Sequence, residues 1–240
     1  MGNRVLITRP EPSASLTAAK LADLGFSPVL LPISRIVALE FAIPSRGFDA
    51  RFEALAVTSA NAFRHTDVEH LAPLKTLPLF VVGEGTAKAA KEAGFQKVIE
   101  GGGDAVHMAA TMADQLPRGA KILYLAGRVR QPIFEALVAE TGFLMDVCDV
   151  YDIAMIDHGR DAVKVVFDQG PFVAVLFYSG VAAQGFVDLI AKNHMELDAQ
   201  TRFLCISRRV AAQLPDPWQA RALIAEHPDE AGIFRLFSKL

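Results

Sequence analysis

Short apolar runs alternate with amphipathic stretches along the whole chain. Near-continuous runs of Val, Ile, Leu and Phe, such as 173–178, are typical of strands buried on both faces of a parallel sheet. The stretches between them repeat apolar residues at helical spacing, and several end at glycine. The expected strands are 5–8, 28–31, 54–58, 79–82, 97–100, 122–125, 143–147, 173–178, 203–206 and 222–224, and the expected helices are 13–24, 84–93, 105–115, 131–141, 181–192, 208–213 and 229–237. This alternation predicts an α/β fold with parallel sheets.

The two halves of the chain carry four pairs of similar segments in the same order. Residues 7–26 match 125–143, 56–63 match 176–186, 80–95 match 203–218, and 99–109 match 224–234. The members of each pair lie about 120 residues apart, close to half the chain, and four ordered matches exceed what chance gives. We therefore predict an internal duplication of one α/β unit, with a boundary near residue 118.

Six of the expected strands end at small or polar residues that lead into a helix. These ends are 8–9, 58–61, 83–86, 127–128, 178–180 and 207–209. In open parallel sheets, ligands bind outside the carboxyl ends of the strands, where free N–H groups of helix first turns attract anions. Any single Ser or Thr there is explained by helix capping. The six ends together favour one binding cleft between two domains.

Composition and charge exclude several classes of protein. The chain has 240 residues, of which 52% are hydrophobic and 21% charged, so it can bury a core and is not intrinsically disordered. A net charge of −3 argues against nucleic acid as a partner. No apolar run approaches the roughly 18 residues of a membrane span, and the N-terminus does not resemble a signal peptide. We expect a cytoplasmic protein, with Cys148 and Cys205 as core residues.

Motifs for nucleotides, metals and activated nucleophiles are not found in the sequence. The glycines 101–103 lack the spacing of a dinucleotide-binding loop, and the six histidines are scattered. No metal site is expected, and no Ser-His-Asp or Cys-His set is evident. Asp104 and Asp229 hold equivalent places in the repeat and are expected to cap helices. What remains is binding, or catalysis by orientation and hydrogen bonding.

The series of motifs as a whole resembles the uroporphyrinogen-III synthase family. The matching segments are ITRPE (7–11) with the following GF (25–26) and LLPI (30–33), AVTSANAF (56–63), FVVGEGTAKAAKEAGF (80–95), LYLAGRVR (123–130), DVYDI (149–153), FYSGVAAQGF (177–186), FLCIS (203–207) and AEHPDEAGI (225–233). They cover nearly the whole chain in the order of the family. Each motif is weak alone, whereas the spaced series is specific.

The resemblance implies two flavodoxin-like parallel-sheet domains joined by a two-stranded linker, with the active site in the cleft between them. Residues 1–35 and 155–240 would form one discontinuous domain, and residues 36–154 the other. The connectors would lie near 33–38 and 150–156. This crossed arrangement differs from the boundary near residue 118 that the repeat suggests, and we adopt the crossed arrangement.

The resemblance also implies an activity. It implies a lyase that cyclises the linear small molecule hydroxymethylbilane with inversion of ring D, without a cofactor, as a monomer in transient contact with the preceding deaminase. Tyr151, in the DVYDI motif, would assist the departure of hydroxide. The residues that would bind the substrate carboxylates are Arg9, Thr58, Ser59, Thr86, Arg128, Arg130, Ser179 and Ser207.

One segment departs from the family pattern. Residues Ser207-Arg208-Arg209-Val210 stand where many members have a Gly-Pro-Thr-Thr-like turn. Either the two arginines bind carboxylates in place of the threonines, or the loop has a different structure.

Two other hypotheses compete with the synthase. One is a cytoplasmic two-domain binding or sensor protein that closes on an anionic ligand without catalysis. The other is a nucleotide-binding or flavin-binding α/β protein, which the missing phosphate loops disfavour.

Overall fold

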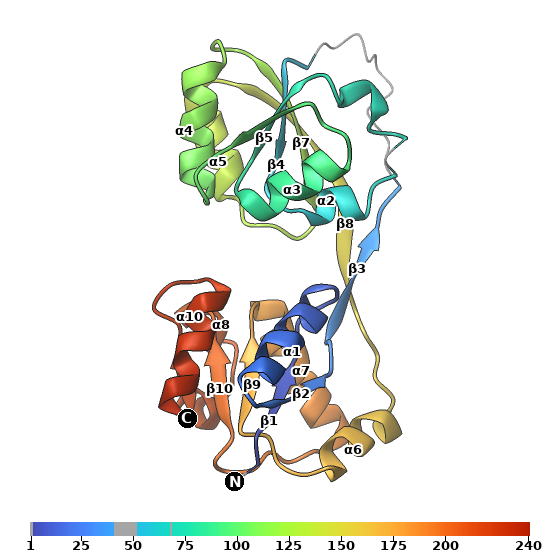
Figure 1. Ribbon diagram of the computed structural model, residues 1–240, viewed down its shortest axis with the longest axis vertical. Coiled ribbons are helices and arrows are strands. Elements are labelled where there is room, and N and C mark those ends of the chain that lie inside the picture. Colours follow the sequence, from blue (N-terminus) through green and yellow to red (C-terminus); the bar gives the residue numbers. More distant parts are fainter. Residues whose placement is uncertain (1, 41–51, 68) are drawn as a thin grey trace. The chain divides into compact units, whose positions relative to one another are not determined.

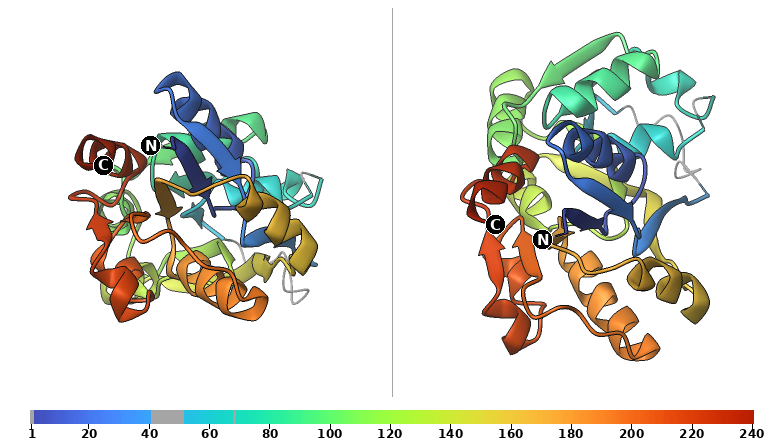
Figure 2. Two further views of the ribbon diagram at one scale, coloured as in Figure 1. Left: turned by 90° about the horizontal axis from the view of Figure 1, so that it is seen from below. Right: turned by 60° about the horizontal axis from the view of Figure 1, so that its bottom comes forward.

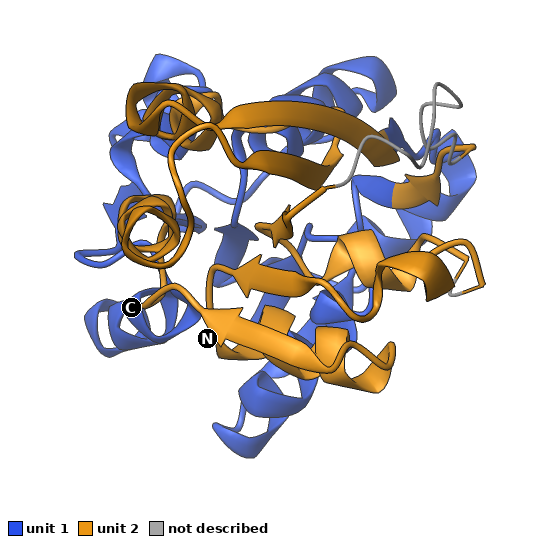
Figure 3. Cartoon of the chain, turned by 90° about the horizontal axis from the view of Figure 1, so that it is seen from above, with its two compact units in different colours: residues 1–35, 154–240 blue, residues 36–153 orange. Residues whose placement is uncertain are grey.

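The computed structural model describes residues 2–40, 52–67 and 69–240 (Figure 1). The chain forms two compact units, coloured separately in Figure 3. Unit 1 consists of Met1–Arg35 and Ala154–Leu240, and unit 2 consists of Ile36–Ile153. Each unit is built around its own sheet of mainly parallel strands, with helices on both faces.

The sheet of unit 1 has the order β11-β10-β9-β1-β2, and every neighbouring pair is parallel. Its strands are β1 (Arg4–Ile7), β2 (Ser27–Leu30), β9 (Ala174–Phe177), β10 (Arg202–Cys205) and β11 (Ala222–Ile224). Its helices are α1 (Ser13–Asp23), α6 (Arg160–Asp168), α7 (Gly180–Asn193), α8 (Arg208–Ala211), α9 (Asp216–Gln219), α10 (Glu230–Arg235) and the 3-10 helix η2 (Leu236–Lys239). Helices α1 and α10 pack on one face of the sheet, and α6, α7 and α8 pack on the other (Figures 1 and 2).

The sheet of unit 2 has the order β3-β8-β7-β4-β5-β6. Its strands are β3 (Ser34–Ala38), β4 (Ala54–Val57), β5 (Pro78–Val81), β6 (Lys97–Glu100), β7 (Lys121–Gly127) and β8 (Leu144–Met155). Its helices are α2 (Asn61–Arg64), the 3-10 helix η1 (Ala72–Leu74), α3 (Glu84–Glu92), α4 (Ala105–Gln115) and α5 (Ile133–Thr141). Helices α2, η1 and α3 cover one face, and α4 and α5 cover the other.

Burial explains why the central strands read as uninterrupted apolar runs. All four residues of β4 and all four of β9 are fully buried, because helices cover both faces of each sheet. The predicted α/β class with parallel sheets is confirmed.

The chain passes between the two units within strands β3 and β8, which are neighbours in the sheet. The amide of Leu39 donates to the carbonyl of Val150 (3.0 Å), and the amide of Ile156 donates to that of Ile33 (2.9 Å). The partner numbers fall on one strand as they rise on the other, so these segments are antiparallel.

The strands of the four matched sequence pairs take equivalent places in the two sheets. Strand β1 corresponds to β7, β9 to β4, β10 to β5, and β11 to β6. The orders β2-β1-β9-β10-β11 and β8-β7-β4-β5-β6 then coincide position by position. This correspondence is compatible with an internal duplication.

Several elements differ from the sequence-based expectation. The expected strand 143–147 continues to Met155. Strand β3 was not among the strands expected from the apolar pattern, and only the family resemblance implied a linker strand near 33–38. Helices α2, α6 and α9 were also missed, since α2 and α9 have only four residues each. The expected helix 208–213 ends at Ala211, and 229–237 divides into α10 and η2.

Candidate functional site

Each unit has one topological switch point, which is the place in the sheet where the connections from two adjacent strands run in opposite directions. In unit 1 the chain goes from β1 to β2 on one side and returns to β9 on the other. In unit 2 the corresponding neighbours are β4 and β7. Ligands of open α/β sheets bind outside the carboxyl ends of such strands. Arg9 and Ser179 follow the unit 1 pair, and Thr58 and Arg128 follow the unit 2 pair.

Arg9 is held by side chains of its own unit. Its Nη1 donates to Oε1 of Glu230 and to Oγ1 of Thr17, both at 3.1 Å. Its guanidinium carbon lies 4.0 Å from the ring centroid of Tyr178, within the range of a cation–π interaction. Lys20 forms a further ion pair with Glu230. The Arg9 side chain therefore joins the carboxyl end of β1 to α1, β9 and α10.

The pKa values of Glu230 and Tyr178, which contact Arg9, are shifted from their ordinary values. Burial alone would raise the pKa of Glu230, but hydrogen bonds from Lys20 and Thr17 and the charges of Lys20 and Arg9 lower it overall. Burial raises the pKa of Tyr178 to about 12. At neutral pH this cluster therefore contains a carboxylate, two cations and a protonated phenol.

Ser179 and Ser207, the two serines of unit 1 that were predicted to bind substrate, cap helices. The Ser179 Oγ accepts a hydrogen bond from the Ala182 amide (3.1 Å), and the Ser207 Oγ accepts one from the Val210 amide (3.4 Å). Both serines have extended backbone, as helix caps do. After Ser207 the chain enters helix α8 directly, and the side chains of Arg208 and Arg209 are exposed.

At the switch point of unit 2, Thr58 is paired with a residue that sequence reasoning missed. The hydroxyls of Thr58 and Tyr124 are 2.7 Å apart, which joins the carboxyl end of β4 to the middle of β7. The Tyr124 ring packs edge-on against Phe134, with centroids 4.9 Å apart. Burial raises the pKa of Tyr124, so its hydroxyl remains protonated at neutral pH. The only sequence signal for Tyr124 was its place in the LYLAGRVR motif.

Tyr151 lies at a β-bulge between β7 and β8. Ala126 pairs with Asp149 and Gly127 pairs with Tyr151, so Val150 is an extra residue on β8. Successive residues of a regular strand point to opposite faces, yet Val150 and Tyr151 both pack in the core formed with α2 and α3. The bulge thus turns Tyr151 toward the face covered by α2 and α3, and leaves it 9% exposed.

The two arginines after β7 belong to a network with three carboxylates. Arg130 contacts Glu135 (Nε to Oε1, 2.5 Å) and Asp149 (Nη1 to Oδ1, 2.7 Å). Arg128 contacts Asp152 (Nη1 to Oδ2, 3.0 Å). Desolvation lowers the pKa of Arg130, but hydrogen bonds and charge from its two acidic partners outweigh this and raise it. The Arg128 side chain is the more exposed of the two, at 58% against 23% for Arg130.

Ser59 and Thr86 take part in local turn contacts. The Ser59 Oγ accepts a hydrogen bond from the Asn61 amide (3.3 Å) at the start of α2. The Thr86 amide donates to the Gly83 carbonyl (3.0 Å) in the first turn of α3, and its side chain is half-buried. Both residues follow strands β4 and β5 at the carboxyl end of the unit 2 sheet.

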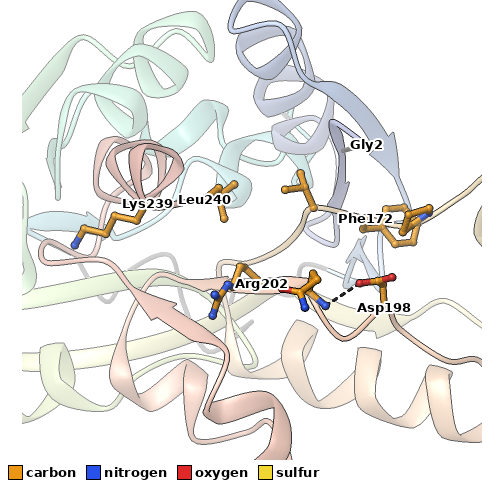
Figure 4. A pocket seen from close by; sticks show the side chains of 9 residues that line it. Gly2, Phe172, Asp198, Arg202, Lys239 and Leu240 are labelled. Atoms are coloured by element: carbon orange, nitrogen blue, oxygen red, sulfur yellow. Dashed lines mark hydrogen bonds between the residues drawn. The ribbon is translucent and has the colours of Figure 1, made fainter.

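A pocket in unit 1 lies away from these residues (Figure 4). It has a volume of about 350 Å³ and is lined by Gly2, Pro171, Phe172, Val173, Asp198, Gln200, Arg202, Lys239 and Leu240. Gly2 and Val173 precede β1 and β9, and Arg202 begins β10, so the pocket lies at the amino ends of these strands. It contains none of the residues predicted to bind substrate.

The described residues form no cluster suited to binding a metal ion, and their two cysteines are buried. No group of three or more His, Cys, Asp or Glu side chains is placed among the described residues to hold a metal ion. Cys148 and Cys205 are buried and form no disulfide, as expected of core residues. Burial raises the pKa of Cys205 to about 12. Asp104 and Asp229 accept hydrogen bonds from the amides of His107 and Gly232, which confirms both as helix caps.

Comparison with known proteins identifies the family. Residues 15–235 match the family described as uroporphyrinogen-III synthase HemD. The chain belongs to the uroporphyrinogen-III synthase family. The "Porphyrin biosynthesis protein HemD" of Ruminiclostridium josui is 23% identical over 242 residues, which is 94% of this chain and 46% of that protein. The chain therefore spans about half the length of this curated relative.

Solved uroporphyrinogen-III synthases share the fold. The crystal structure of the synthetase from Helicobacter pylori matches with a TM-score of 0.69 and 17% identity, covering 100% of this chain and 99% of that one. A mutant synthase from Thermus thermophilus matches with a TM-score of 0.52 and 17% identity, covering 98% and 97%. The family and the fold class predicted from the sequence are thus confirmed, and no helix among the described residues is long and apolar enough to cross a membrane.

Proposed function

We propose that this protein is a uroporphyrinogen-III synthase, a lyase that converts hydroxymethylbilane into uroporphyrinogen III with inversion of ring D. The observation that carries the proposal is the family match over residues 15–235. The placement of Arg9, Ser179, Thr58 and Arg128 at the two switch points supports it, because those positions bind ligands in open α/β sheets.

The substrate sets the first requirement, since it carries eight carboxylates. Such a ligand is best held by many N–H donors together with a few arginines rather than by one strong cation. Helix α7 begins directly after β9, at the unit 1 switch point, and α3 begins after β5, the strand next to β4 in the unit 2 sheet. The N-terminus of a helix attracts anions. Arg128, the more exposed arginine after β7, would exchange Asp152 for a substrate carboxylate.

The reaction begins with loss of hydroxide from the hydroxymethyl group. The pyrrole nitrogen pushes electrons toward the carbon, the C–O bond breaks, and the leaving oxygen takes up a proton to depart as water. We propose that the Tyr151 hydroxyl hydrogen-bonds this oxygen as it leaves. The resulting azafulvene is reactive enough to close without help, but it then gives the uninverted isomer.

Inversion therefore depends on orientation. Ring D must be held so that its substituted carbon is attacked, which gives a spiro intermediate that fragments, recloses and loses a proton. Holding one geometry and excluding a competing one requires shape and hydrogen bonds. On this proposal the substrate binds in the cleft between the two units, and the protein is a cytoplasmic monomer that receives hydroxymethylbilane from the preceding deaminase.

Product analysis tests the proposal. Porphobilinogen and a purified deaminase generate hydroxymethylbilane in situ, with and without this protein, and chromatography separates the uroporphyrinogen isomers. We expect the product to shift from type I to type III when the protein is present. Type I alone, in the presence of folded protein, would refute the proposal and favour a binding protein for an anionic ligand.

A further inference from the structure

The ring of Tyr151 lies directly against the backbone of Gly127. A Cβ atom placed on Gly127 would lie 2.6 Å from both Cε2 and Cζ of Tyr151 and 2.9 Å from its hydroxyl oxygen. These distances are too short for non-bonded atoms, and the ring is part of a packed core that resists displacement. A side chain at position 127 would therefore force the Tyr151 ring to move.

His65 contacts the Tyr151 ring from a second element. The two ring centroids are 6.4 Å apart, and the rings are inclined at 42°. His65 ends helix α2, the helix that follows Thr58 and β4. Burial lowers the pKa of the half-buried His65, and the charge of Arg64 lowers it further, so the imidazole is neutral at physiological pH.

The backbone of Tyr151 is fixed as well. Its carbonyl accepts a hydrogen bond from the Arg128 amide (2.9 Å), which continues the pairing of β7 and β8 just beyond the bulge. With the backbone bonded on one side and the ring lying against Gly127 and His65, the side chain has little freedom to rotate. The position of the phenol is thus determined by its neighbours before any substrate binds.

We propose that Gly127 is a positioning residue for Tyr151: its missing side chain leaves the space in which the phenol stands at the switch point of unit 2, and His65 forms the other wall of that space. This inference rests on the proposed function, because it assigns the phenol a task at the leaving oxygen. A displaced phenol loses that contact, whereas the groups that bind substrate carboxylates stay in place. Gly127→Ala should therefore lower kcat by about tenfold or more with little change in KM.

A double-mutant cycle distinguishes positioning from a merely structural role. The kcat values of wild type, Gly127→Ala, Tyr151→Phe and the double variant are compared, with Gly159→Ala as control because a Cβ there meets open space. If Gly127 acts through the phenol, the alanine should cost less than about twofold once the hydroxyl is gone. The same fold loss in both backgrounds, or a Gly127→Ala variant as active as Gly159→Ala, would overturn the inference.

A spectroscopic measurement tests the geometry without turnover. The chain has three tyrosines, so 3-fluorotyrosine labelling gives three 19F resonances, which single Tyr→Phe variants assign. Gly127→Ala should shift the Tyr151 resonance and leave that of Tyr178, in unit 1, unchanged. An unmoved Tyr151 resonance would refute the positioning role, whatever the activity of the protein. If the wild-type protein is inactive but Gly127→Ala still shifts the Tyr151 resonance, the proposed function is refuted, whereas the positioning of Tyr151 by Gly127 is upheld.

Variants of His65 provide the test if Gly127→Ala does not fold. His65→Ala removes one wall beside the phenol, whereas His65→Phe retains an aromatic ring there. We expect His65→Ala to lower kcat and His65→Phe to restore most of it. Full activity of His65→Ala would contradict the inference.

Discussion

Arg9 stabilises unit 1, so Arg9→Gln should lower the stability of that unit. The variant removes the ion pair between Arg9 and Glu230, whose side chains are 23% and 28% exposed, respectively. A pair at this exposure contributes about 0.5–1 kcal/mol to the free energy of unfolding. It also removes a cation–π contact of 4.0 Å with Tyr178, worth about 0.5–2 kcal/mol when partly desolvated. The expected loss is about 2 kcal/mol in the free energy of unfolding.

Trp218 allows this loss to be measured in unit 1 alone. It is the one tryptophan of the chain, and it stacks on Phe203 with ring centroids 5.0 Å apart. Its fluorescence, excited at about 295 nm, therefore reports the unfolding of unit 1 in urea. With a slope of about 2 kcal/mol per molar urea, the midpoint of Arg9→Gln should fall by about 1 M.

Arg235→Gln is the matched control in the same unit. Arg235 is 55% exposed and lies 3.9 Å from Asp229, so its loss should cost less than about 0.5 kcal/mol. Equal midpoints for Arg9→Gln and Arg235→Gln would refute the reasoning and leave Arg9 free to bind a ligand. A double-mutant cycle that combines Arg9→Gln with Glu230→Gln should show a coupling of at least about 0.5 kcal/mol in the free energy of unfolding.

Three further outcomes follow from the site and the connectors. Tyr151→Phe should slow turnover by about tenfold or more while thermal unfolding stays within about 1 °C of wild type, as product chromatography and calorimetry would show. Because the pKa of folded Glu230 is lowered, its stabilising effect is present above the ordinary glutamate pKa and lost as pH falls below it. The Trp218 urea midpoint should therefore drop more steeply between about pH 5 and 3 in wild type than in Glu230→Gln. Gly185→Ala should destabilise unit 1 by about 1–3 kcal/mol in urea unfolding, since a Cβ there would lie 2.5 Å from Ile33, and Gly159→Ala should not. A neutral Gly185→Ala would contradict the tight packing of the connector strands on α7.

The parts of the fold that the sequence predicted are those with strong periodic patterns. The strand expected at 173–178 is β9, and both faces of it are buried, which is why its apolar run is continuous. The apolar pattern did not indicate β3, because it is a partly exposed edge strand whose hydrogen bonds come from β8, far along the chain. Only the family resemblance implied a linker strand near 33–38. The bulge at Ala126/Gly127 depends on the register of two strands, and no local sequence signal marks it.

The sequence shows which candidate residues follow the strand ends, but it does not show which side chains they contact. Ser179 was recognisable as a helix cap because capping is local. The partner of Thr58 is 66 residues away, and the partner of Arg9 is 221 residues away, so both depend on which strands and helices become neighbours. The sequence alone therefore suggested Arg9 as a partner for a substrate carboxylate, without indicating that the folded chain surrounds it with Glu230, Thr17 and Tyr178.

The rate of type III uroporphyrinogen formation tests the central claim most directly. With hydroxymethylbilane generated in situ, the rate should rise in proportion to the concentration of wild-type protein and fall by about tenfold or more for Tyr151→Phe at equal concentration. A product that remains type I at every concentration of wild type, while Trp218 fluorescence shows the protein to be folded, would contradict the account.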